Sequence, residues 1–117
     1  MNHDADEIET AETFLTEMLE ADRVGHYSSF IQHFDPAELE GFDEKAFLDD
    51  VALMRDELGA YQSRHFLGSL QGFQHEDRPQ SRRFVWRAVY EKNEALIILG
   101  MHRKDGEWVV NESVVSK

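Results

Sequence analysis

The spacing of apolar residues divides the chain into a helical front half and a strand-rich back half. Up to about residue 58, apolar residues recur every three or four positions, which is the period of one face of an α-helix. From about residue 60, apolar and polar residues alternate, which is the period of a strand. We therefore predict one α+β domain over residues 1–117, with N-terminal helices at about residues 4–58 packed on a curved four-stranded antiparallel sheet at about residues 60–116.

Local signals indicate where the helices begin and end. A capping-box pattern opens the first helix and a glycine ends it. A short second helix is predicted within residues 26–34. An acidic N-cap followed by proline and glutamate marks a start at residues 35–38, and a longer helix then runs from a second acidic cap to a glycine stop. The signal residues are Asp4, Glu7, Gly25, Asp35, Pro36, Glu38, Asp43 and Gly59.

The back half indicates four strands joined in sequence as a meander. A polar loop at residues 74–81 links the first two strands, and Lys92 and Asn93 form the next turn. Asp105 and Gly106 are a strong hairpin signal between the last two strands. Gly68 predicts a bend or bulge in the first strand. The predicted strands are residues 60–71, 82–92, 94–103 and 107–117.

Residues 95–101 are apolar throughout, although an antiparallel strand with one wet face should alternate. The helices can cover only one face of the sheet, so the other face needs a cover of its own. A second copy of the chain is the preferred cover, because two-fold dimers are the commonest assembly and exposed apolar patches mark interfaces. A curled sheet covered by its own loop is the alternative. The predicted dimer interface contains Val85, Val89, Leu96 and Ile98.

The net charge of −12 is concentrated in the helical half. Fifteen of the 24 acidic residues lie in residues 1–50, where Arg23 and Lys45 are the only basic residues. Because an acidic surface repels phosphate groups, we expect no nucleic-acid partner. The acidic face is interpreted as a solvated surface, and a docking surface for a basic partner is the alternative.

The chain has no cysteine, which excludes disulfides and thiol chemistry. No apolar run is long enough for a membrane span, so we expect no membrane association. The N-terminal residues are acidic and show no leader, so we expect a cytoplasmic location, with export if a leader preceded them. His26 and His33 are seven residues apart, which is too far for the usual helical metal pair. We expect no metal and no cofactor.

Two segments resemble the nuclear-transport-factor-2-like (NTF2-like) superfamily, and the order of helices and sheet resembles the related cystatin-like layout. They are Glu-Leu-Gly-Ala-Tyr-Gln-Ser-Arg at residues 57–64 and Asp-Gly-Glu-Trp-Val-Val at residues 105–110. The resemblance extends from about Phe14 onward and is closest to small bacterial families of unknown function. It implies a sheet curved around a long helix to form a cone-shaped cavity. Enzymes of the superfamily carry an aspartate or histidine base deep in this cavity, and no residue here matches that base by motif.

The register of the last hairpin decides whether Glu112 faces the cavity. A two-residue turn at Asp105 and Gly106 places Glu112 opposite Leu99, on the inner face. There, desolvation would raise the pKa of its carboxyl and suit it to acid–base work. A three-residue turn with a bulge at Gly106 moves Glu112 to the outer face, with His102. The sequence leaves both registers open.

The first strand carries three polar side chains with possible roles. Alternation places Tyr61 and His65 on one face and Arg64 on the other. His65 is a candidate base because histidine titrates near neutral pH. Arg64 could bind a ligand carboxylate. Pairing of Arg64 with an acid of the long helix is the preferred interpretation, and the candidate partners are Asp49, Asp50 and Glu57.

The leading hypothesis is a non-catalytic homodimer that binds a small apolar ligand or a partner protein. The first alternative is a small cavity enzyme, of the isomerase or dehydratase type that the resemblance suggests, with His65 or Glu112 as general base. The second alternative is an acidic adaptor for a basic partner. The predicted pocket residues are Phe47, Val51, Met54, Tyr61, Arg64, Trp86, Tyr90 and Leu99.

Overall fold

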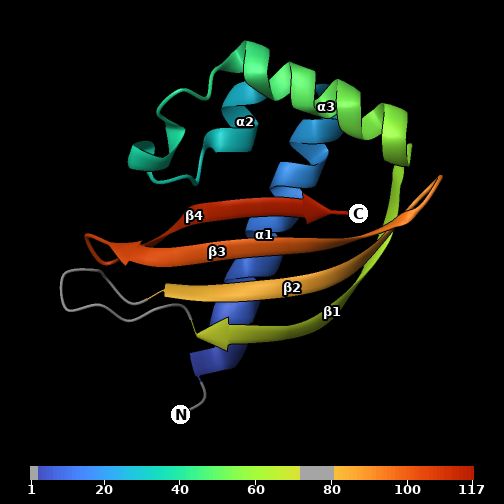
Figure 1. Cartoon of the computed structure of the whole chain (residues 1–117). Helices are drawn as coiled ribbons and strands as arrows, with labels where there is room; N and C mark the ends of the chain where they lie inside the picture. Colours follow the sequence, from blue (N-terminus) through green and yellow to red (C-terminus); the bar gives the residue numbers. More distant parts are fainter. Residues whose placement is uncertain (1–2, 72–80) are drawn as a thin grey trace.

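The computed structural model describes residues 3–71 and 81–117 and confirms an α+β fold. Three helices and a short 3-10 turn precede a four-stranded antiparallel sheet (Figure 1). Residues 74–80 of the predicted first interstrand loop lie outside the described residues. The elements are α1 (His3–Val24), α2 (Tyr27–Ile31), η1 (Pro36–Leu39), α3 (Glu44–Leu58), β1 (Tyr61–Gln71), β2 (Ser81–Tyr90), β3 (Glu94–Lys104) and β4 (Glu107–Ser116).

The predicted helix ends are confirmed, and one predicted start is wrong. Gly25 and Gly59 follow α1 and α3 with φ angles of 71° and 77°, a left-handed conformation that glycine adopts without strain. The Asp43 carboxylate caps α3 by accepting a hydrogen bond from the Ala46 N–H. The predicted cap Asp4 instead lies inside α1, because the helix already begins at His3.

The sheet is the predicted meander, in the order β1-β2-β3-β4. α1 crosses one face of it, which we call the inner face, and α2 and α3 lie beyond the β4 side (Figure 1). The inner-face side chains of β2 and β3 pack against an apolar stripe of α1 and are almost completely buried. Burial of this area supplies the main stabilising free energy of the fold. The core includes Ala11, Leu15, Met18, Phe84, Trp86, Ala88, Ile97, Leu99 and Met101.

Two bulges in β1 change which side chains share a face. Tyr61 pairs with Tyr90, but Ser63 pairs with Val89, so one extra residue lies between the two pairs. Tyr61 therefore shares the inner face with Arg64, and the predicted common face for Tyr61 and His65 is wrong. The second bulge, just before Gly68, is the irregularity predicted for this strand.

The last hairpin follows the two-residue turn register only as far as Val110. Asp105 and Gly106 have φ angles of 53° and 84°, as a tight two-residue hairpin turn requires, and Met101 pairs with Val110. A register shift then occurs, and Glu112 pairs with Gly100 on the outer face. A bulge in β4, which neither predicted turn included, therefore places Glu112 on the outer face.

Arg64 anchors α1 to the sheet, but through a different acid from those predicted. Its guanidinium donates to the Glu12 carboxylate at 2.7 Å and to the Thr16 hydroxyl at 2.8 Å, both on α1. The prediction of a partner on α3 is wrong because α1, rather than α3, lies across the inner face at β1. The other oxygen of Glu12 accepts from the indole N–H of Trp86, so this carboxylate is satisfied on both sides.

The segment that precedes α3 is held against the edge of β4. Phe34 forms a parallel bridge with Val110. Asp35 is buried and accepts from Lys104 Nζ at 2.9 Å, while His102 Nε2 lies 2.8 Å from its other oxygen. The hydrogen bonds from Lys104 and from the Ala37 N–H lower the pKa of Asp35 to about 2. This cluster therefore has a structural role, because it holds the segment before α3 over the edge of the sheet.

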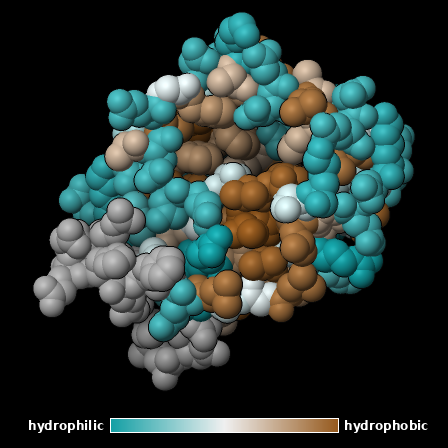
Figure 2. Space-filling view, in the orientation of Figure 1, coloured by the Kyte–Doolittle hydropathy of each residue, from teal (hydrophilic) through white to brown (hydrophobic). Residues whose placement is uncertain are grey.

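The outer face of the sheet is not covered by any described residue. Figure 2 shows an apolar patch over the middle of the strands. Leu96 and Val114 are 42% and 39% exposed, and other apolar side chains of β2 and β3 lie around them, half-buried. No helix within residues 3–71 and 81–117 has the length and apolarity needed to cross a bilayer.

Candidate functional site

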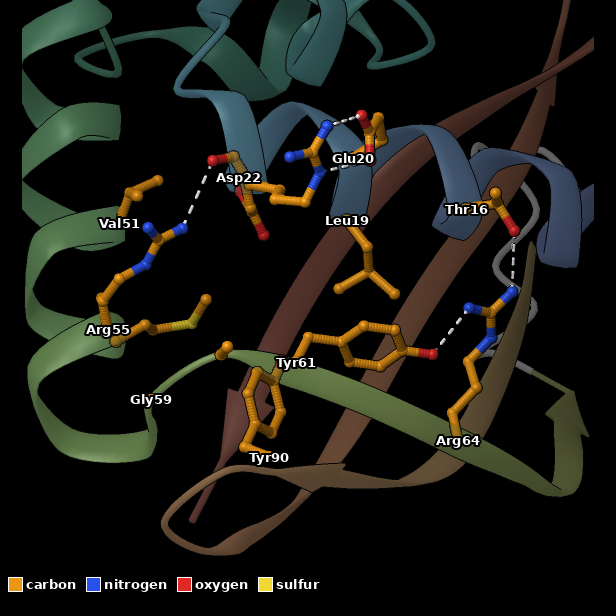
Figure 3. Close-up of a pocket in the computed structure, with 13 residues that line it drawn as sticks. Thr16, Leu19, Glu20, Asp22, Val51, Arg55, Gly59, Tyr61, Arg64 and Tyr90 are labelled. Carbon is orange, nitrogen blue, oxygen red and sulfur yellow. Dashed lines mark hydrogen bonds and ion pairs between the residues drawn. The ribbon is translucent and has the colours of Figure 1, made fainter.

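A cavity of about 490 Å³ lies between the C-terminal half of α1, the end of α3 and the adjoining ends of β1 and β2 (Figure 3). This volume falls within the usual range for small-molecule sites. Most of its wall is apolar or aromatic. The lining residues are Thr16, Leu19, Glu20, Asp22, Arg23, Val51, Met54, Arg55, Gly59, Ala60, Tyr61, Arg64 and Tyr90.

The turn from α3 into β1 forms one wall of the cavity. Gly59 is needed there for two reasons: its φ angle is positive, and a Cβ atom would lie only 2.8 Å from the Cβ of Glu91. The loop after β2 packs closely on this turn, because the Glu91 N–H donates to the Ala60 carbonyl at 2.8 Å. The small residues thus hold β1 and the end of β2 beside α3 at the cavity.

Asp22 brings a carboxylate into this mostly apolar space. Burial raises the pKa of Asp22 to about 7, with the nearby Asp50 raising it further and Arg55 acting in the opposite direction. No hydrogen bond or ion pair joins its carboxylate to another side chain in the described part of the chain. In Figure 3, Asp22 on α1 lies across the space from Tyr61 and Tyr90. Asp22 can therefore exchange a proton near neutral pH.

Tyr61 and Tyr90 form an aromatic corner opposite α1. Their rings meet edge to face, with centroids 5.7 Å apart. The Tyr61 hydroxyl accepts a hydrogen bond from Arg64 at 3.0 Å, whereas the buried Tyr90 hydroxyl has no partner among the described residues. Burial, reinforced by the negative charge of Asp22, raises the pKa of Tyr90 to about 12. Tyr90 thus keeps its proton at neutral pH, and its hydroxyl oxygen is buried rather than exposed in the cavity.

The arginines around the cavity all have partners. Arg23 donates to Glu20 at 2.5 Å, and Arg55 donates to the Arg23 carbonyl at 3.3 Å. Arg64 is bound to Glu12. The positive groups at the rim are therefore engaged in holding α1, α3 and β1 together, while Asp22 is not.

Five of the eight predicted pocket residues line the cavity. The other three, Phe47, Trp86 and Leu99, are at most 1% exposed and lie in packed parts of the interior. They were expected at the cavity because they occupy inward positions of α3 and the sheet. α1 and the aromatic residues of α2 fill the space in front of them. The five that line the cavity are Val51, Met54, Tyr61, Arg64 and Tyr90.

The two candidate bases lie away from the cavity. His65 pairs with Arg87 on the outer side of β1 and is exposed. Glu112 is also on the outer face, where Arg83 donates to it at 2.8 and 3.2 Å across Gly100. The absence of a side chain at Gly100 allows this contact, because a Cβ there would come within 2.9 Å of the Glu112 Cβ.

The two histidines weighed for a metal site have other contacts. His26 caps α2 through Ser29, and His33 pairs with Glu17 while stacking on the ring of Phe14. Across residues 3–71 and 81–117, no three histidine or carboxylate side chains are grouped so that they could hold a metal ion.

Asp22 was missed by the sequence reasoning, although a signal for it exists. The apolar stripe of α1 runs through Leu15 and Met18, and the next position at helical spacing is Asp22. A carboxylate on the core-facing stripe of a helix is an unusual placement. Asp22 does not stand out by residue type, because the surrounding segment is already rich in acidic residues.

Comparison with known proteins gives no relative on which to base a function. No protein-family model matches the chain, and no curated protein matches it.

Proposed function

We propose that the chain is a homodimeric binding domain of the NTF2-like type that holds a small, largely apolar molecule. The observation that carries this proposal is the cavity of about 490 Å³, whose walls are mainly Leu19, Val51, Met54 and the two tyrosine rings. Sites for small molecules combine such apolar walls with a few convergent polar groups, and Asp22 is such a group here.

Binding can be tested with 4-phenylbutan-1-ol, a neutral apolar probe that fits this volume. Amide chemical shifts of residues around the cavity, such as Leu19 and Ala60, should change as the probe is added. Met54→Trp should abolish the changes because the indole fills the cavity. Leu53→Trp is the matched control, since Leu53 is 56% exposed and does not line the cavity. Shift changes that survive Met54→Trp, or no changes in the wild type, would contradict the proposal.

The dimer is proposed to form through the outer face of the sheet, with a second copy as the occupant. Val85, Val89, Leu96 and Ile98 support this, because they lie on the uncovered face as the alternation predicts. Charge supports a second copy over another partner. The ionic residues Arg83, Arg87, Glu94 and Glu112 form two ion pairs on this face. The face is therefore charge-balanced on a chain of net charge −12, and two copies can meet there without repulsion.

Light scattering at high micromolar concentration tests the dimer. The wild type should have twice the mass of one chain, and Ile98→Lys should have the mass of one, because a buried unpaired charge opposes the interface. Leu53→Lys is the control, since it places the same charge on an exposed apolar position of α3. A monomeric wild type would remove the dimer from the proposal.

A second candidate function is proton transfer on a small apolar carbonyl compound. Asp22 favours it, because a carboxyl whose pKa is about 7 can take up and return a proton at neutral pH. In such a reaction the Asp22 carboxylate removes a proton next to the carbonyl. Asp22 then returns the proton to the same carbon or to a neighbouring one.

Exchange of the α-protons of 4-phenylbutan-2-one in deuterated water tests this second function. The wild type should accelerate exchange over buffer, Asp22→Asn should abolish the acceleration, and Glu9→Gln should retain it. Glu9 is a suitable control because it is an exposed acid of the same helix and does not line the cavity. Exchange no faster than in buffer would leave the chain a binding domain.

A further inference from the structure

The charged groups around the cavity are unevenly matched. Arg23 and Glu20 satisfy each other, Arg64 is bound to Glu12, and Arg55 donates to a backbone carbonyl. The carboxylate of Asp22 is the one lining charge that has no hydrogen bond or ion pair with any side chain or backbone group in the described residues, whereas Arg55 has the Arg23 carbonyl as its acceptor. A ligand that enters the cavity therefore meets one unmatched group, and that group is an acid.

The aromatic corner suits the same kind of ligand group. The faces of tyrosine rings carry partial negative charge and attract cations. Tyr61 and Tyr90 meet at an interplanar angle of 74° and so form two adjoining aromatic walls opposite Asp22. The Tyr90 hydroxyl oxygen is buried, so it is the rings of the two tyrosines that face the ligand.

We propose that the cavity binds an amphipathic amine, with its protonated nitrogen held by Asp22 and the aromatic corner and its apolar body against Leu19, Val51 and Met54. This inference rests on the proposed binding function and names the chemical class of the ligand. The apolar body of the ligand would contact most of the cavity wall, and its ammonium group would pair with Asp22.

Other ligand classes fit the cavity less well. A ligand carboxylate would need a cation, but Arg23 and Arg64 are already paired with glutamates and Arg55 donates to the Arg23 carbonyl. It would also be repelled by Asp22. A purely apolar ligand would displace water from Asp22 without replacing the lost hydrogen bonds, which weakens binding. A protonated amine provides both the charge and the donors.

Amine binding should depend on pH through Asp22. The charged and titratable groups that face Asp22 or line the same space are Arg55 and Asp50 on α3, Tyr61 and Arg64 on β1, Tyr90 on β2, and Glu20 and Arg23 on α1. Burial among them raises the pKa of Asp22 to about 7. Amine affinity should therefore increase as the pH rises from about 6 to 8, because Asp22 becomes ionised while a primary amine stays protonated.

The test compares three probes that share one apolar body: 4-phenylbutylamine, 4-phenylbutan-1-ol and 5-phenylpentanoate. Isothermal titration calorimetry on the wild type at pH 8 should show the amine binding about tenfold more tightly than the alcohol, as one charge-assisted hydrogen bond allows. The pentanoate should bind more weakly than the alcohol. In Asp22→Asn the amine should lose its advantage and its pH dependence. In the control Glu9→Gln, which changes an exposed acid of α1 that does not line the cavity, both should remain.

Each alternative outcome has a distinct meaning. If the alcohol binds in the cavity as tightly as the amine, the binding function stands and the inferred ligand class is wrong. A pentanoate that binds most tightly would overturn the inference in the same way and assign the arginines to the ligand. Binding of none of the probes would overturn the binding function itself. Because the pH dependence is measured on the wild type, the inference can fail even if a variant does not fold.

Discussion

The acidic residues at the two ends of α1 differ in whether their carboxylates have partner side chains. Near its N-terminus, Glu7 pairs with Arg82 at 2.5 Å, and Glu12 binds both Arg64 and Trp86. Ten residues after Glu12, Asp22 reaches a similar depth with no partner side chain in the described part of the chain, beside a cavity. The same helix therefore carries matched carboxylates at one end and an unmatched one at the other.

This difference distinguishes a structural carboxylate, Glu12, from a candidate ligand-binding carboxylate, Asp22. A carboxylate that is hydrogen-bonded on both oxygens keeps its charge at little cost and fixes the helix on the sheet. A buried carboxylate without a partner loses hydration, and its charged form is destabilised. Such a residue weakens the fold, so a ligand that satisfies it offers a physical reason for its presence.

The largest predicted effect is a gain in stability when the unmatched acid is removed. The pKa of Asp22 is about 7 in the fold and 3.8 in the unfolded chain, so the folded state holds this proton more tightly. The Asp22 contribution should therefore reduce stability as the pH rises from about 4 to 7. Above pH 7 the full penalty is present, on the order of 4 kcal/mol at 1.36 kcal/mol per unit.

Urea unfolding of the wild type and Asp22→Asn at pH 5 and pH 8 measures this effect. The variant should be the more stable at both values, and its advantage should be larger at pH 8. An advantage that does not grow with pH would mean that Asp22 is solvated or paired, and the contrast between the two ends of α1 would disappear.

Removal of Glu12, an acid that has hydrogen-bond partners, should destabilise the fold. Glu12→Ala leaves the Trp86 indole N–H and the half-buried Arg64 guanidinium without their acceptor, so the free energy of unfolding should fall by about 2 kcal/mol. Glu9→Ala is the control, since Glu9 lies on the exposed side of the same helix and should change stability by less than about 0.5 kcal/mol. Equal effects of the two changes would show that the Glu12 contacts contribute no stability.

A pair of tyrosine variants provides a smaller test of the same contrast. Tyr61→Phe removes an acceptor used by Arg64 and should lower the free energy of unfolding by about 1 kcal/mol. Tyr90→Phe removes a buried hydroxyl that has no partner within residues 3–71 and 81–117, so stability should stay the same or rise. Chemical denaturation measures both. A loss for Tyr90→Phe as large as that for Tyr61→Phe would indicate that the Tyr90 hydroxyl is satisfied within the fold.

The sequence predicted those features that depend on neighbours along the chain. Gly25 and Gly59 ended helices because few other residues tolerate the required φ angle, and Asp43 capped α3 through its own first turn. Asp105 and Gly106 fixed a tight hairpin for the same local reason. The order of helices and strands followed from these signals and from the change in apolar period.

The sequence could not predict features that depend on the exact pairing of strands. A single extra residue in β1 or β4 reverses the face of every side chain beyond it. These bulges placed His65 and Glu112 on the outer face. The partner of Arg64 was also unpredictable, because the helical half contains many acids and only the packing of α1 selects Glu12. The periodicity alone could have drawn attention to Asp22.

The titration of Asp22 itself tests the central claim most directly. Carbon-13 chemical shifts of its side-chain carboxyl group, followed by NMR over pH 3 to 9 in the unliganded protein, report its pKa without any substitution. We expect a midpoint near pH 7, because the carboxyl is desolvated in the cavity and has no partner side chain among the residues that the structure describes. A midpoint near pH 4 would contradict it, since Asp22 would then be either exposed to water or matched by a cation, like the acids at the other end of α1.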